Sequence, residues 1–157
     1  MKTIQGPGIF LAQFVRDSEP FNSIEGLGRW VSGFGYKGVQ IPTWESSLID
    51  LEKAASSKAY CDEYKGRLAE MGLEIIELGS YLQGQVLAFH PAYAPGFEAF
   101  HPKGLKGAEV TEWATDQLKK TVDASVNFGT SNISAMSGGF AWHMIYPWPQ
   151  RPEGVID

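Results

Sequence analysis

Polar and aromatic side chains with binding chemistry are concentrated in three segments that lack helical periodicity. Trp44 follows one apolar run, and Trp142 follows another. Gln83 and Gln85 flank Gly84 in the longest irregular stretch, from Gly79 to about Gly107, so we expect their amides to project near one another from a tight bend. Primary amides donate and accept hydrogen bonds, as sugar hydroxyls require, and an indole face can stack on a sugar ring. Two alternatives stay open: the amides could form hydrogen bonds with backbone groups of their own loop, and Trp142 could pack in a hydrophobic core.

The three histidines of the chain, His90, His101 and His143, raise the question of a metal site. No two of them have the i, i+4 spacing of a helical zinc site, and the carboxylates near them form no recognisable ligand set. The sequence therefore favours loop histidines that bond to backbone or water over metal ligands.

Few other side chains could serve as a base or a nucleophile. Glu45 and Glu77 stand near strand ends, and Glu77 alternates with apolar residues, so it could face either side of its strand. Gln13 or Phe14 should face the same end of the sheet, at the close of the first strand. Cys61 is the only cysteine, which excludes a disulfide within the chain, and its apolar setting predicts a buried small side chain.

Three amphipathic segments predict the helices that position these loops. They begin near Asn22, where Glu25 forms a capping box, near Ser57 and near Ala108. Each ends at a glycine suited to a left-handed cap, namely Gly35, Gly72 and Gly129. Strand-like runs cover 9–15, 37–41, 73–78 and 131–136.

The alternation of strands and helices predicts an α/β fold with parallel strands joined by right-handed crossovers. An open nucleotide-binding sheet would carry a glycine-rich loop after its first strand, but residues 16–21 are acidic and contain no glycine. We therefore expect a (β/α)₈ barrel, of which residues 1–157 supply about four βα units. On this prediction the chain is the N-terminal half of a single barrel domain.

Composition narrows the range of partners. The net charge is −5 and the basic residues are scattered, which disfavours a nucleic-acid partner. The apolar runs are too short to cross a bilayer, and the N-terminus lacks the apolar core of a secretion signal. We expect a cytoplasmic protein that binds a small molecule.

The chain resembles the sugar phosphate isomerase/epimerase family, which has the xylose isomerase-like barrel. The likeness covers essentially all 157 residues and is carried by Gly38-Val39-Gln40-Ile41-Pro42-Thr43-Trp44, by Leu82-Gln83-Gly84-Gln85-Val86 with His90-Pro91-Ala92-Tyr93, and by Tyr146-Pro147-Trp148-Pro149-Gln150-Arg151-Pro152. One branch of the family looks like subunits of C-glycoside-cleaving enzymes.

The resemblance implies a divalent metal (manganese, magnesium or zinc) that polarises a sugar while a proton moves through an enediolate. The family's metal ligands come from strands five to eight, so none is expected in this chain. The substrate-binding positions that the resemblance implies are Trp44, Tyr81, Gln83, Gln85 and Trp142. Tyr81 stands where many relatives carry a histidine, and tyrosine is a poorer proton shuttle near neutral pH.

These observations leave three functional hypotheses. In the first, the chain is half of a metal-dependent sugar isomerase or epimerase and needs the missing C-terminal half. In the second, two copies complete one barrel and form a carbohydrate-binding or structural module without the metal site. The third, the endonuclease branch of the same fold, is disfavoured by the acidic balance.

Overall fold

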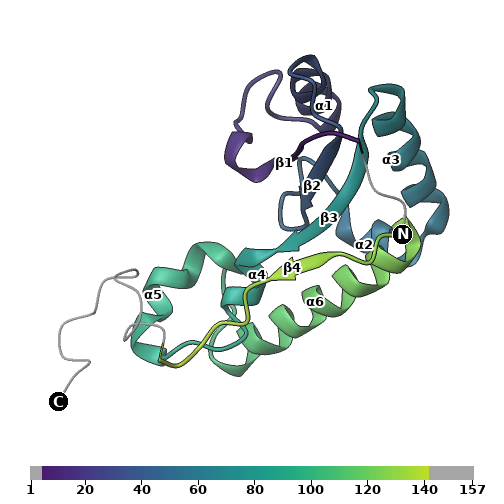
Figure 1. Ribbon diagram of the computed structural model, residues 1–157. Coiled ribbons are helices and arrows are strands. Elements are labelled where there is room, and N and C mark those ends of the chain that lie inside the picture. The colour runs from purple at the N-terminus through teal and green to yellow at the C-terminus, as the bar shows by residue number, and fades with distance from the viewer. Residues whose placement is uncertain (1–4, 142–157) are drawn as a thin grey trace. The chain divides into compact units, whose positions relative to one another are not determined.

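The structure, a computed structural model, describes residues 5–141 and contains one parallel sheet. Its strands are β1 (Gly8–Phe10), β2 (Gly38–Pro42), β3 (Glu74–Ser80) and β4 (Ile133–Ala135), and each lies beside the next strand of the chain in the order β1-β2-β3-β4 (Figure 1). The helices are α1 (Ile24–Gly33), α2 (Leu51–Ser56), α3 (Lys58–Glu70), α4 (Tyr81–Gln85), α5 (Ala94–Phe97) and α6 (Ala108–Phe128). The remaining elements of the described residues are three short 3₁₀ turns: η1 (Ala12–Phe14), η2 (Pro91–Tyr93) and η3 (Glu98–Phe100). The α/β class and the parallel strands are confirmed.

The chain divides into two compact units. Of the described residues, 5–80 with 120–134 form the first unit, and 81–119 with 135–141 form the second. The first unit holds nearly all of the sheet, and each unit has its own hydrophobic cluster. None of the helices within residues 5–141 is long and apolar enough to cross a membrane.

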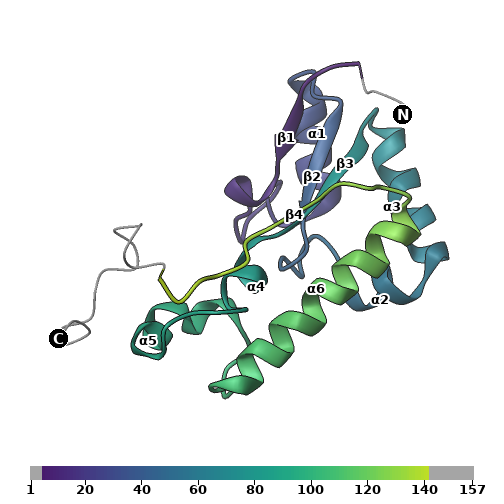
Figure 2. The ribbon, with the colours of Figure 1, turned by 60° about the horizontal axis from the view of Figure 1, so that its bottom comes forward.

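In the first unit the helices cover one face of the sheet. Val39, Ile41 and Leu78 are fully buried and belong to the same cluster as apolar residues of α1, α2, α3 and the last turns of α6. In Figure 2 α3 and the end of α6 nearest to it lie on the same side of β3. Because successive side chains of a strand point to opposite faces, residues between these core positions face away from the helices. We call this second surface the open face.

A β-bulge in β3 sets which side chains reach the open face. Val39 pairs with Ile75, whereas the next residue, Gln40, pairs with Glu77, so Ile76 is the extra residue. Such a bulge re-aims the side chains of its strand. Gly8 alternates with Ile9, the residue of β1 that packs against the core, and a Cβ placed on Gly8 would lie 2.4 Å from Ile76 Cδ1. Ile76 and Glu77 therefore both lie on the open face.

Local signals in the sequence account for the helix ends. The second predicted helix, α3, begins at the expected place, and Ser57 caps it by accepting a hydrogen bond from the Tyr60 N–H. The first helix is capped by Ser23, whose Oγ accepts from the Gly26 N–H, so the prediction of Asn22 was wrong by one residue. Gly35, Gly72 and Gly129 have φ of 85°, 72° and 72°, which confirms the left-handed caps.

Three other expectations need correction. The first strand ends at Phe10 rather than near residue 15, because η1 follows, and Phe14 packs against Trp30 with ring centroids 4.9 Å apart. Gln13 lies in the same turn and donates to the Phe10 carbonyl. The helix α2 was not predicted; Asp50 caps it by accepting from the Lys53 N–H. The stretch from Gly79 to Gly107, expected to be irregular, contains α4, η2, α5 and η3.

In the second unit two segments far apart in sequence run directly against each other. A Cβ on Gly84 would lie only 1.9 Å from the Met136 carbonyl oxygen, and one on Gly138 would lie 2.3 Å from the Ala88 oxygen. Gly138 also has φ of 65°, which favours glycine. The Gly139 N–H donates to the Ala88 carbonyl at 2.6 Å. The chain after β4 is thus fixed to the chain after β3 where both carry glycine.

Candidate functional site

A row of polar side chains crosses the open face of the sheet. Gln40 Nε2 donates to Glu77 Oε1, and Ser134 Oγ donates to the same oxygen. Gln40 Nε2 also lies 3.2 Å from Ser134 Oγ. The three residues come from β2, β3 and β4 and are all half-buried. The sequence left the direction of Glu77 open, and the structure places its carboxylate in this polar row.

An aromatic pair borders the same face. Phe10 is the register partner of Gln40 on β1, and its ring meets the Trp44 ring edge-on, with centroids 6.2 Å apart. Trp44 follows β2 and is half-buried. The open face thus combines a carboxylate, an amide, a hydroxyl and two aromatic rings. Such a set can accept hydrogen bonds from the hydroxyl groups of a ligand and donate hydrogen bonds to them, while an aromatic ring covers an apolar face of the ligand.

Sequence reasoning found Trp44 and Glu77 but missed the partners of the carboxylate. Gln40 interrupts the apolar run of β2, and Ser134 occupies the middle of β4. A polar residue within a buried parallel strand is the signal that could have identified both, because such strands are usually continuous apolar runs. Their convergence on Glu77 depends on how the strands pair, and the sequence alone does not determine that pairing.

Behind the sheet, three buried hydroxyl groups tie the ends of β2 and β3 to α6. Thr43 Oγ1 donates to the Gly79 carbonyl at 2.9 Å and lies 3.3 Å from Ser80 Oγ. Thr121 Oγ1 of α6 lies 3.3 Å from Ser80 Oγ and 3.4 Å from Thr43 Oγ1. At 4%, 0% and 0% exposure, Thr43, Ser80 and Thr121 are out of reach of a ligand. Their role is to hold the ends of the strands in place.

The expected substrate-binding residues after β3 lie in the short helix α4 and do not form a pair. Residues two apart on a helix do not face each other, so the amides of Gln83 and Gln85 point in different directions. Gln83 is 1% exposed and belongs to the interior of its unit, whereas Tyr81 and Gln85 are half-buried. The expectation that the two amides project together from a tight bend is therefore wrong.

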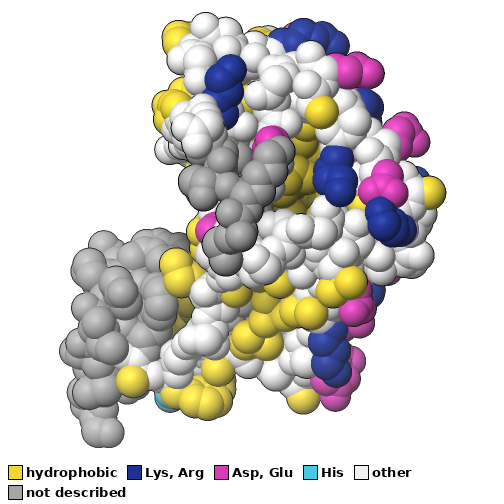
Figure 3. All heavy atoms as spheres, turned by 45° about the vertical axis from the view of Figure 1, so that its right-hand side comes forward, with side chains coloured by type: hydrophobic (Ala, Val, Ile, Leu, Met, Phe, Trp, Pro, Cys, Tyr) yellow, Lys and Arg dark blue, Asp and Glu magenta, His cyan; other side chains and the backbone are white. Residues whose placement is uncertain are grey.

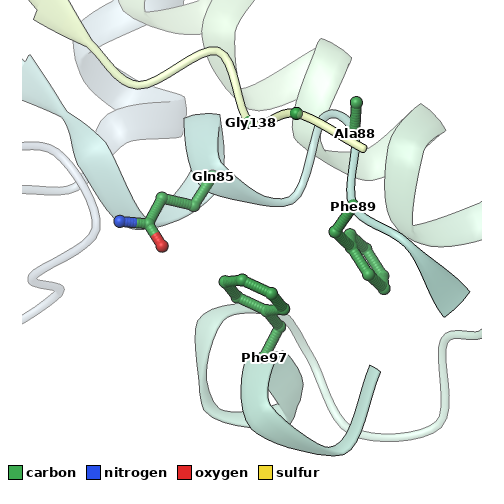
Figure 4. A pocket seen from close by; sticks show the side chains of 6 residues that line it. Gln85, Ala88, Phe89, Phe97 and Gly138 are labelled. Carbon is green, nitrogen blue, oxygen red and sulfur yellow. The ribbon is translucent and has the colours of Figure 1, made fainter. Parts of the chain in front are cut away.

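Gln85 borders a narrow crevice with Phe89 and Phe97. Its side-chain oxygen points towards the Phe97 ring (Figure 4), and within residues 5–141 that buried oxygen accepts no hydrogen bond. The crevice has no room for a water molecule. Of the five expected binding positions, Trp142 lies outside the described residues, as does His143.

The histidines and the cysteine that the sequence offered as candidates have contacts typical of structural residues. His90 Nδ1 accepts from the Ala92 N–H at 3.2 Å, and His101 Nδ1 lies 3.0 Å from the Pro102 carbonyl oxygen. Across residues 5–141 no three histidine, cysteine or acidic side chains gather as metal ligands. Cys61 is fully buried, and burial, with a smaller contribution from Asp62, raises the pKa of its thiol to about 11. It is therefore protonated near neutral pH and unsuited to be a nucleophile.

Basic side chains do not gather on the face seen in Figure 3, where most lie beside acidic ones. The ion pairs of the described residues include Lys58 with Asp62 at 2.6 Å and Lys53 with Asp50 at 3.0 Å. In these ion pairs the carboxylate offsets the positive charge that a phosphate would need.

No model of a known protein family matches the chain, and a search of curated proteins finds no match either. The family resemblance carried by the sequence segments therefore remains an expectation.

Proposed function

We propose that this chain is the N-terminal half of a (β/α)₈ barrel that acts as a sugar isomerase or epimerase. In this proposal the chain supplies substrate-orienting groups, and the second half supplies the metal site. The observation that carries the proposal is the parallel order β1-β2-β3-β4 with a polar and aromatic open face.

The strand order supports a barrel more than an open doubly wound sheet. In doubly wound folds the strand order reverses and helices cover both faces. Here consecutive strands are neighbours, and the helices of the first unit pack on one face. In a barrel the other face turns inward and lines the core and the substrate end. Val122 and Val126, one turn apart on α6 and 52% and 74% exposed, offer an apolar flank on which a further helix could pack.

The open face suggests how the chain would hold a sugar. The Trp44 ring, supported by Phe10, would stack on the apolar face of the sugar. Glu77, held by Gln40 and Ser134, would accept a hydrogen bond from a sugar hydroxyl. Gln40 and Ser134 connect this carboxylate to two neighbouring strands, which fixes its position before the sugar binds.

The described residues do not fit a divalent metal. Glu77 is one carboxylate beside an amide and a hydroxyl, and no three-ligand group exists within residues 5–141. The proposal therefore assigns the metal ligands and the proton-transferring residues to the second half and derives no step through the metal from this chain.

The test begins with the product of the natural gene. Its intact mass is expected to be about twice 17.3 kDa, as a full barrel requires. That product, incubated with a panel of ketoses in heavy water, should incorporate deuterium at the carbon beside the carbonyl, and chelation of divalent metal should stop the exchange. In the long form, Glu77→Gln should raise the KM for the sugar, whereas Glu63→Gln on the exposed side of α3 should not.

A mass of 17.3 kDa without deuterium exchange would refute the proposal. One alternative is then a subunit of a C-glycoside-cleaving enzyme. The other is a pair of half-barrels that form a non-catalytic carbohydrate-binding or structural module. Sedimentation equilibrium distinguishes this alternative, because two copies completing one barrel would give twice the chain mass and a stability that rises with protein concentration.

A further inference from the structure

A cavity of about 670 Å³ lies within the second unit, between α5 and η3 on one side and the loop leading into α6 on the other. Apolar side chains make most of its wall, among them Phe89, Ala94, Leu105 and Val110. Val110 is 1% exposed and belongs to the hydrophobic cluster of this unit, so the cavity reaches the edge of a packed core. Pockets for small organic ligands measure roughly 300–1,000 Å³. The volume therefore suits a molecule with one ring or a short chain.

The lining of the cavity holds two ammonium groups that are available to a ligand. Lys103 and Lys106 line it and are exposed, and among residues 5–141 neither ammonium group belongs to an ion pair. Glu98 is the single carboxylate among the described lining residues, and His101 completes their ionisable set. The nearby Glu109 is not a lining residue, and its carboxylate accepts from the backbone N–H of Lys106. The two ammonium groups can therefore pair with an anionic ligand.

The loop that carries the lysines is shaped by two glycines. Gly104 and Gly107 have φ of 97° and 52°, in the left-handed region that other residues rarely adopt. The Lys106 N–H donates to Glu109 Oε2 at 3.1 Å, which fixes the end of this loop to the first turn of α6. The two lysines therefore leave the backbone at set positions above the apolar wall.

We propose that this cavity binds an amphipathic organic anion, with an aromatic or short acyl body against Phe89, Leu105 and Val110 and a carboxylate beside Lys103 and Lys106. The apolar body gains free energy by leaving water, and the carboxylate stays at the wet rim where the ammonium groups neutralise it. The site uses no residue of the sheet, so it is independent of the proposed sugar chemistry.

Calorimetric titration of the full chain with 4-phenylbutyrate, and with its uncharged analogue 4-phenylbutan-1-ol, tests this proposal. A probe of this size should bind the parent with a Kd on the order of 1 mM. The double variant Lys103→Ala/Lys106→Ala should bind 4-phenylbutyrate about five-fold more weakly than the parent and should bind the alcohol with unchanged affinity. The control variant Lys37→Ala/Lys119→Ala removes two exposed lysines outside the cavity lining, and it should bind both probes with the affinity of the parent.

A variant that fills the cavity separates specific from general binding. Ala99 lines the cavity and is exposed, so Ala99→Trp should keep the fold, checked by circular dichroism, and abolish binding of both probes. Equal 4-phenylbutyrate affinity in the parent and in Lys103→Ala/Lys106→Ala would overturn the assignment of the carboxylate. Absence of saturable binding by either probe to the parent, or unchanged binding in the filled variant, would overturn the site itself.

Discussion

Replacement of Gly84 by alanine tests the contact that fixes the chain after β4 to the chain after β3. The added Cβ would lie 1.9 Å from the Met136 carbonyl oxygen, 2.9 Å from its carbon and 3.0 Å from its nitrogen. All three atoms are backbone, so no side-chain rotation relieves the overlap. Overpacking of this kind costs about 3 kcal/mol at the upper end of its range. Alanine in the helix returns about 0.5–1 kcal/mol, so Gly84→Ala should lower the free energy of unfolding by about 2 kcal/mol.

Gly66→Ala is the matched control. Gly66 is exposed in α3, and a Cβ there meets no atom within 4 Å, so the same substitution should raise the free energy of unfolding by about 0.5–1 kcal/mol. Urea denaturation followed by circular dichroism measures the free energy of unfolding of both variants. The slope of this free energy against urea concentration should stay that of the parent. A Gly84→Ala protein as stable as the parent would show that the two segments are not in contact, and the reasoning would fail.

The remaining predictions concern the first unit. Ser23→Ala should lower the free energy of unfolding by about 1 kcal/mol and Asn22→Ala by much less, measured by urea denaturation, because Ser23 is the cap of α1. Native Cys61 should react with a thiol reagent far more slowly than the unfolded chain at pH 8. Its raised pKa stabilises the fold below the ordinary value of 9.0, and thermal melts should show this contribution lost as the pH rises towards about 11. Val126→Lys should leave the melting temperature of the isolated chain nearly unchanged, since Val126 is 74% exposed.

The parts of the fold that could be predicted from sequence are those with local causes. Ser57 and the glycines at 35, 72 and 129 determine helix ends through nearby hydrogen bonds and backbone angles, and all were identified correctly. The helix α4 was missed because a five-residue segment that contains a glycine has little intrinsic helicity. Its close packing against the Met136 backbone, more than 50 residues away, is a tertiary effect.

The candidate site was predictable only in part for the same reason. Trp44 was expected from its place after a strand, but the polar row around Glu77 depends on the register of three strands. The extra residue Ile76 shifts that register, and alternation along a single strand cannot reveal a shift relative to its neighbour. The direction of Glu77 therefore stayed undecided until the strands were paired.

The bulge at Ile76 also bears on how this surface could change during evolution. If Ile76 were absent, Ile75 and Glu77 would be consecutive and would pair regularly with Val39 and Gln40, so the carboxylate would stay on the open face. Loss of that codon would therefore remove the bulge and leave Glu77 beside Gln40. A further residue inserted before Glu77 has a different effect: unless the bulge takes up a second extra residue, the carboxylate turns towards the apolar core, where an unpaired carboxylate is costly. We therefore expect relatives with an alignment gap at Ile76 to keep this carboxylate on the open face, and insertions at the same place to be selected against.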